Sequence, residues 1–205
     1  MFSFENFRRE IKSYLEKNKS IYLVLLLCFF AGLIVGIIIA VSKTSYLGLL
    51  NIKDKNFVSL INGAYAPMTL FWKCFSKILI LFIIIFLFSL NFYLNILNFV
   101  IVIYQSSLLF LSCLAIIQSY NFLGFLKVFL IVLPVNIILF ILIFFWIVCC
   151  SIRSKMANRL NVFNAGFDNV FFRCLYICLF LIFVYSIIIS FVLPLILKSA
   201  IFLIF

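Results

Sequence analysis

The chain has 205 residues, of which 68% are hydrophobic and only 10% are charged, and phenylalanine alone occurs 29 times. This composition excludes an ordinary soluble domain and is typical of an integral membrane protein. A net charge of +11 would suggest nucleic acid binding in a soluble chain, but the basic residues here fall mostly at the edges of apolar runs. We interpret them as determinants of topology and contacts to anionic lipid headgroups of the bilayer, and we expect no nucleic acid partner.

Two parts are expected: residues 1–20 as a basic amphipathic N-terminal segment and residues 21–205 as a single multi-pass membrane domain. The first part is equally consistent with a surface helix or with a solvated tail. Residues 21–41 form an unbroken apolar run, about 31 Å long as a helix, which matches a hydrocarbon layer of about 30 Å. It is predicted to be the first span and an uncleaved signal anchor. Gly32 and Gly36 within it allow another backbone to approach closely.

Residues 42–77 are predicted to form the one sizeable loop, because Asn62-Gly63 and Pro67 are turn signals. Trp72, Lys73 and Lys77 are interpreted as its return to the membrane interface, where indole rings and long basic side chains settle. The second span is therefore expected at residues 78–94.

Asn91, Asn95 and Asn98 share a helix face and permit two interpretations, a polar substrate track or a chain reversal. The apolar stretch from residue 78 to residue 117 is too long for one span, so we favour a reversal at the asparagines. The third span is expected at residues 99–117.

Leu133-Pro134-Val135-Asn136 interrupts the apolar run between Tyr120 and Cys150. Proline removes a backbone donor inside a helix, and a freed carbonyl must find another partner in hydrocarbon. A lysine at mid-bilayer costs roughly 2.5 to 3.5 kcal/mol, so Lys127 favours an interfacial or re-entrant helix that breaks at Pro134, followed by a fourth span at residues 135–150. The alternative is one kinked span.

Residues 151–173 carry Arg153, Lys155, Arg159 and Arg173 and are predicted to be a basic loop. By the positive-inside rule, this loop and the N-terminus belong on the cytoplasmic side of the cell membrane. The fifth span is expected at residues 174–193. The predicted fold is an all-α integral membrane protein with about five transmembrane helices and a short interfacial or re-entrant helix.

The sequence offers no catalytic set. It contains no histidine, and Asp54 and Asp168 are the only acids beyond the N-terminal segment. A proton relay or hydrolytic triad within the spans is therefore excluded. The seven cysteines have no Cys-x-x-Cys spacing; Cys174 and Cys178, which share a helix face, are better explained by packing than by a metal. We expect no enzyme activity, no cofactor, no metal site and no small-molecule substrate.

The chain resembles the stage II sporulation protein M family over nearly its whole length. Three stretches carry this resemblance: Ala31-Gly32-Leu33-Ile34-Val35-Gly36; Tyr120-Asn121-Phe122-Leu123-Gly124-Phe125-Leu126 leading to Leu133-Pro134-Val135-Asn136; and Phe191-Val192-Leu193-Pro194-Leu195-Ile196-Leu197-Lys198. The structural residues taken from them are Gly32, Gly36, Gly124, Leu133, Pro134, Asn136 and Pro194. In the third span, where the resemblance leads us to expect glycine packing, the chain has Tyr104-Gln105-Ser106-Ser107.

The resemblance implies a membrane scaffold without enzymatic activity. Such a scaffold recruits two membrane-anchored peptidoglycan hydrolases, the stage II sporulation proteins D and P, so that septal wall is thinned during engulfment in endospore formation. The main rival is a transporter or the membrane subunit of an ABC-type permease, because broken helices also build transport sites.

Overall fold

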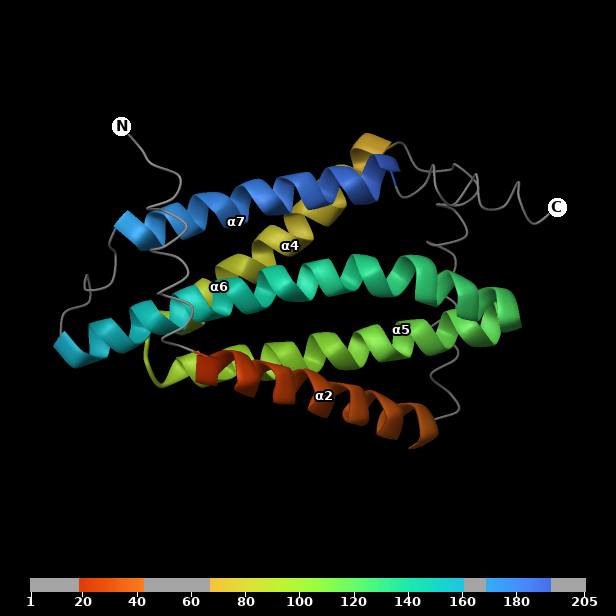
Figure 1. Cartoon of the computed structure of the whole chain (residues 1–205), viewed down its shortest axis with the longest axis horizontal. Coiled ribbons are helices and arrows are strands. Elements are labelled where there is room, and N and C mark those ends of the chain that lie inside the picture. The colour runs from red at the N-terminus through yellow and green to blue at the C-terminus, as the bar shows by residue number, and fades with distance from the viewer. Residues whose placement is uncertain (1–18, 43–66, 161–168, 193–205) are drawn as a thin grey trace.

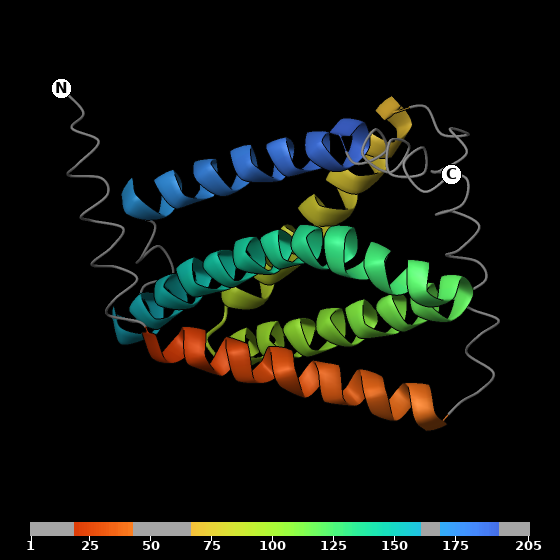
Figure 2. The same ribbon diagram turned by 45° about the vertical axis from the view of Figure 1, so that its right-hand side comes forward.

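The computed structural model describes residues 19–42, 67–160 and 169–192, and all three stretches are mainly helical. The elements are α2 (Lys19–Ser42), α4 (Pro67–Ser89), η2 (Leu94–Ile96), α5 (Leu97–Lys127), η3 (Val128–Val132), α6 (Leu133–Leu160), α7 (Asn169–Ile187) and η4 (Ile188–Val192). The long helices alternate in direction, and α4 crosses the bundle obliquely (Figures 1 and 2). Lys19, the start of α5, the end of α6 and the start of α7 therefore share one end of the bundle.

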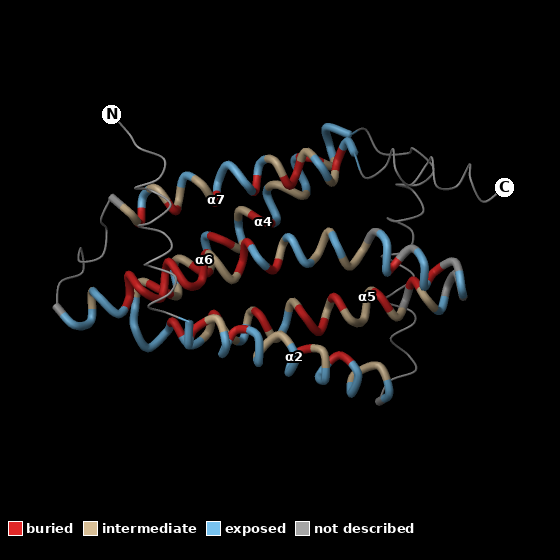
Figure 3. Tube along the Cα trace, viewed as in Figure 1, coloured by how far each residue is buried: buried red, intermediate tan, exposed pale blue. Residues whose placement is uncertain are grey.

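Five helical segments of the described chain are long and apolar enough to cross a membrane. Large apolar side chains such as Leu27, Ile34, Ile80 and Phe180 are exposed on the outside of the bundle, as Figure 3 shows for the outer faces of the helices. Lipid can cover such a surface, whereas water cannot do so favourably. The fold is all-α and is consistent with a multi-pass membrane protein.

The first two spans differ in how well their boundaries were predicted. The helix expected at residues 21–41 is present as α2, which is long and apolar enough to cross a membrane. The second helix begins at Pro67, not near residue 78, so the end of the predicted loop is wrong. Proline is favourable in a first helical turn, where its missing N–H would have no intrahelical acceptor, and here it starts a helix. The predicted N-terminal segment, most of the loop and Pro194 lie outside the described residues.

The reversal between the second and third spans is confirmed at residues 90–93. The Tyr93 backbone N–H donates to Asn91 Oδ1 at 2.9 Å, and the Asn95 N–H donates to the Asn91 carbonyl at 3.1 Å. Asn91 thus forms a side-chain-stabilised turn, as asparagine commonly does. The 3₁₀ helix η2 then leads into α5.

A second reversal lies near the end of α5, although its residues keep helical geometry. A β-carbon on Gly124 would overlap the carbonyl oxygen of Ile116 and lie 2.9 Å from the Cα of Ile117. Residues eight apart in a straight helix are about 12 Å apart, so the chain folds back between them. Gly124 is therefore required here for a close approach of two backbone segments, and the fourth candidate span runs from Gly124 to Arg159.

The predicted break at Pro134 is wrong. The helical chain continues through Pro134, and the disturbance is the π-helical turn η3 immediately before it. A π turn shifts the hydrogen-bond register by one residue and so accommodates a proline that cannot donate to the preceding turn. The span expected at residues 135–150 belongs to a longer helical segment, as in the alternative of one kinked span.

The basic loop predicted at residues 151–173 is also wrong at both of its ends. The helix α6 continues to Leu160, and α7 already begins at Asn169. Arg153, which was predicted to lie in this loop, is a helical residue and is fully buried at 0% exposure. The basic residues here thus belong largely to helix ends.

Candidate functional site

A group of five buried polar residues joins α4, α5 and α6 at the end of the bundle that contains the residue 90–93 turn. These residues, hereafter the polar cluster, are Ser89, Asn95, Asn98, Ser151 and Arg153, and all are less than 9% exposed. Ser89 is the last residue of α4, the asparagines start the next helix, and the other two lie on α6. Buried polar groups at membrane depth need hydrogen-bond partners inside the protein.

Hydrogen bonds of 2.7 to 3.4 Å supply most of those partners, whereas Asn98 Oδ1 is buried without one among the described residues. Asn98 Nδ2 lies 2.7 Å from Ser89 Oγ, 3.0 Å from Asn95 Oδ1 and 3.3 Å from the Ile85 carbonyl, and its two N–H groups are shared among these three acceptors. Asn95 Nδ2 donates to Ser151 Oγ at 3.1 Å, which links the hairpin to α6. Arg153 Nη1 donates to the Ser89 carbonyl at 3.4 Å.

The bond from Arg153 places a cation at the C-terminus of α4, where carbonyls lack intrahelical donors and the helix dipole is negative. The polar cluster therefore caps a helix and joins three elements. The reversal predicted at the asparagines lies at residues 90–93, and Asn95 and Asn98 follow it and carry this network. One sequence pattern could have revealed this network: two asparagines at i, i+3 spacing and a serine just before the turn.

The glycine step of α2 packs against the serine pair of α5. A β-carbon on Gly32 would overlap Ser106 Oγ and the Ile103 carbonyl, and one on Gly36 would lie 3.0 Å from Phe110 Cβ and 3.1 Å from the Ser107 carbonyl. The single Ser106 O–H is shared between the Val102 and Ile103 carbonyls of its own helix, at 2.9 and 3.0 Å. Serine acts here as a small residue with its hydroxyl satisfied locally, so close packing occurs without glycine on α5.

The Leu-Pro-x-Asn stretch lies where η3 meets α6. Asn136 is half-buried, and its Nδ2 donates to the Val132 carbonyl at 2.7 Å. Leu133 is half-buried in contact with the core, and Pro134 is exposed. Asn136 thus binds a backbone carbonyl in the turn disturbed by the proline, and the stretch shapes a bend in the helix.

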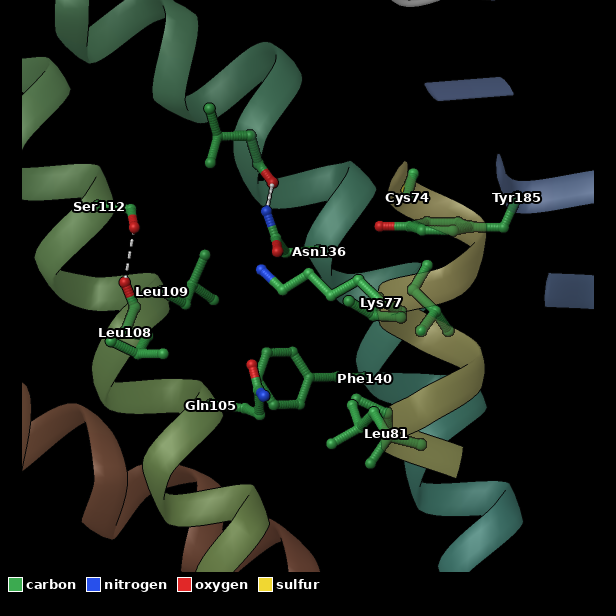
Figure 4. A pocket seen from close by; sticks show the side chains of 14 residues that line it. Cys74, Lys77, Leu81, Gln105, Leu108, Leu109, Ser112, Asn136, Phe140 and Tyr185 are labelled. Carbon is green, nitrogen blue, oxygen red and sulfur yellow. Dashed lines mark hydrogen bonds between the residues drawn. The ribbon is translucent and has the colours of Figure 1, made fainter. Parts of the chain in front are cut away.

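A cavity of about 240 Å³ opens beside Asn136, between α4, α5, α6 and α7. Its polar lining consists of Cys74, Lys77, Gln105, Ser112, Asn136 and Tyr185, and the remaining walls are apolar. Figure 4 shows the Lys77 ammonium reaching between the amides of Asn136 and Gln105. The Ser112 hydroxyl donates to the Leu108 carbonyl of its own helix at 2.7 Å.

Sequence reasoning placed Lys77 at the membrane interface and missed its role as the charged group of this cavity. Lys77 lies in the middle of α4, about 15 Å along the axis from Pro67. The sequence did contain one clue to this position. Only twelve residues separate Lys77 from Ser89, where the helix ends, so a span that ends there must also include residues before Lys77. Gln105, from the stretch where glycine packing was expected, also lines the cavity.

The cysteines of the described chain lie mainly in the core: five of the seven are buried, and the other two are half-buried. Within the described stretches there is no group of three or more His, Cys, Asp or Glu side chains that could hold a metal ion. Cys174 and Cys178 pack in the apolar core together with Cys149 and Cys150.

Comparison with known protein families, with curated proteins and with solved structures finds no match.

Proposed function

We propose that this chain is a membrane scaffold without enzymatic activity, of the stage II sporulation protein M type. In this proposal it lies in the cell membrane at the sporulation septum, with its N-terminus in the cytoplasm. It recruits and positions the membrane-anchored hydrolases called stage II sporulation proteins D and P, so that septal peptidoglycan is thinned and engulfment can proceed.

The main support for this proposal is the position of the residues that carry the resemblance. Gly32 and Gly36 lie at a close helix contact, Gly124 at a tight reversal, and Pro134 and Asn136 at a helix bend. Each of these positions shapes the packing of helices, as expected of residues that maintain a scaffold. The described ranges also contain no aspartate, glutamate or histidine from which acid–base catalysis is usually built.

The proposed orientation rests on charge. Lys19, Lys155, Arg159 and Arg173 lie toward the same end of the bundle. Cytoplasmic ends of membrane helices are enriched in lysine and arginine. The opposite end, where α4 starts, would then face the hydrolases outside.

The direct test is complementation in an endospore-forming bacterium that lacks its own stage II sporulation protein M. The expected result is restored movement of the mother-cell membrane around the forespore, together with co-purification of both hydrolases. Absence of both at normal protein abundance would contradict the proposal.

A pair of neighbouring substitutions sharpens this test. Asn136→Leu removes the amide that binds the Val132 carbonyl, whereas Ile137→Leu changes an exposed apolar side chain of the same helix. We expect Asn136→Leu to reduce hydrolase recruitment or protein abundance and Ile137→Leu to leave both unchanged. Equal recruitment and abundance in the two variants would argue against a role of this helix bend.

The cavity around Lys77 favours a second candidate, a transporter or ABC-type permease subunit, because transport sites often lie within helix bundles at mid-membrane. Deletion of the gene in its own host separates the two. Loss of uptake of a solute with normal engulfment would favour the permease, whereas blocked engulfment with normal uptake would favour the scaffold.

A further inference from the structure

The cavity beside Asn136 has several polar side chains in its lining and opens at the apolar surface of the bundle. Four helices contribute to its lining, and it is partly open at its edge. Lys77 is an exposed residue of α4, while Tyr185 on the opposite wall is only 5% exposed. The cavity therefore extends from the outer surface of the bundle to its buried core.

The electrostatic character of the cavity is positive. Lys77 is the one charged residue in its lining, and the described stretches 19–42, 67–160 and 169–192 contain no carboxylate side chain that could neutralise it. A charged side chain inside a membrane helix is costly and usually marks a site for an ion or ligand of opposite charge. An anion is the ligand that this arrangement fits.

Two neutral amide side chains flank the charged group of the cavity. The amide groups of Gln105 and Asn136 lie on either side of the Lys77 ammonium in Figure 4. Asn136 uses one N–H on the Val132 carbonyl at 2.7 Å and turns its amide oxygen toward the Lys77 ammonium (Figure 4), so its second N–H is the donor left for a ligand. An ammonium together with neutral N–H donors is a common way to bind a phosphate oxygen.

The size and walls of the cavity indicate where the phosphate comes from. About 240 Å³ is less than pockets for drug-sized ligands usually provide, but it suits a headgroup. Leu81, Leu108 and Leu109 continue the lining as apolar wall on α4 and α5. We propose that this cavity binds the phosphate group of an anionic phospholipid, with Lys77 as the charged contact and the acyl chains lying against the apolar walls. This inference does not depend on the proposed scaffold function.

Native mass spectrometry of the full chain tests the site directly. The protein is purified in detergent with phosphatidylcholine and titrated with phosphatidylglycerol or, separately, with inorganic phosphate. We expect phosphatidylglycerol to be retained in preference to phosphatidylcholine, whose trimethylammonium group would oppose Lys77. Lys77→Gln should weaken this binding roughly tenfold, because it removes a charge-assisted hydrogen bond. Lys77→Arg should retain most of it.

Lys73→Gln is the matched control, because Lys73 lies one turn earlier on α4 and does not line the cavity. Equal retention of the two lipids, or equal binding by wild type and Lys77→Gln, would overturn the site. Binding of inorganic phosphate in a Lys77-dependent manner without lipid preference would overturn the lipid as its source. If Lys77→Gln does not fold, Gln105→Leu decides: weakened phosphatidylglycerol binding supports the site, and unchanged binding overturns it.

Discussion

Trp146 on α6 donates its indole N–H to the carbonyl oxygen of Phe82 on α4 at 3.0 Å, across 64 residues of sequence. The same indole stacks on the Phe82 ring, with centroids 5.9 Å apart and planes inclined by 16°. Phe171 on α7 lies 5.8 Å from the indole, so one side chain connects three helices. Tryptophan fits this position because its large apolar ring is buried while its one polar group has an acceptor.

Two substitutions at Trp146 should separate the hydrogen bond from the packing. Trp146→Phe keeps an aromatic ring and should lower the free energy of unfolding by about 1 kcal/mol through the lost hydrogen bond. Trp146→Ala should lower it by roughly 3 to 5 kcal/mol, because a cavity remains. Unfolding of the purified protein by dodecyl sulfate in mixed micelles, followed by circular dichroism, measures both. Trp72→Phe, at an exposed position on α4, is the control and should have little effect.

The two glycines of α2 should differ in their tolerance of alanine. A β-carbon at Gly32 overlaps backbone and side-chain atoms of α5, whereas one at Gly36 meets its nearest neighbours at 3.0 to 3.1 Å. Gly32→Ala should therefore destabilise the protein by about 1 to 3 kcal/mol, as overpacking usually does, and Gly36→Ala by less. Thermal unfolding in detergent would show this order as two different midpoints. Equal midpoints would mean that α2 and α5 do not pack closely enough at Gly32 to exclude a β-carbon.

Several features of the fold could be predicted because the membrane fixes lengths. The α2 span follows from an apolar run that matches the bilayer, and the residue 90–93 turn follows because residues 78–117 exceed one span. The ends of the other helices could not be predicted in the same way. Pro67 was interpreted as a turn residue although it starts a helix, and Arg153 as a loop residue although it binds the last carbonyl of α4. The sequence alone does not reveal that the Ser89 carbonyl at the end of α4 lies close to Arg153 in the folded chain.

The cavity was less predictable than the glycine packing. The spacing of Gly32 and Gly36 predicts close helix packing, because two small residues one turn apart on the same helix face let another backbone approach. Lys77 has no such pattern: the same lysine could extend to the headgroups from a helix that leaves the membrane. Only the oblique course of α4 across the bundle, together with the packing of α5 and α6 against it, places its ammonium at the cavity.

Asn98 should make a measurable contribution to stability through the polar cluster. Asn98→Leu keeps a similar volume and removes the two N–H donors that Asn98 shares among Ser89, Asn95 and the Ile85 carbonyl. Hydrogen bonds within membrane proteins contribute on average about 0.6 kcal/mol each, so we expect a loss of roughly 1 to 2 kcal/mol. Asn158→Leu, at an exposed position of α6, is the matched control. An unfolding free energy equal to wild type in Asn98→Leu would show that the cluster adds nothing to stability.

Pro134 should be the cause of the π-helical turn η3, and hydrogen exchange can test this. Proline has no N–H to offer the carbonyl four residues earlier, and a π turn accommodates that loss. Pro134→Ala restores the donor, so amide exchange at residues 128–136 should slow as a regular α-helix forms. Pro67→Ala is the control: at the start of α4 the added N–H has no intrahelical acceptor, so exchange in that helix should stay unchanged. Unchanged exchange at residues 128–136 in Pro134→Ala would show that side-chain packing, not the proline, imposes the π turn.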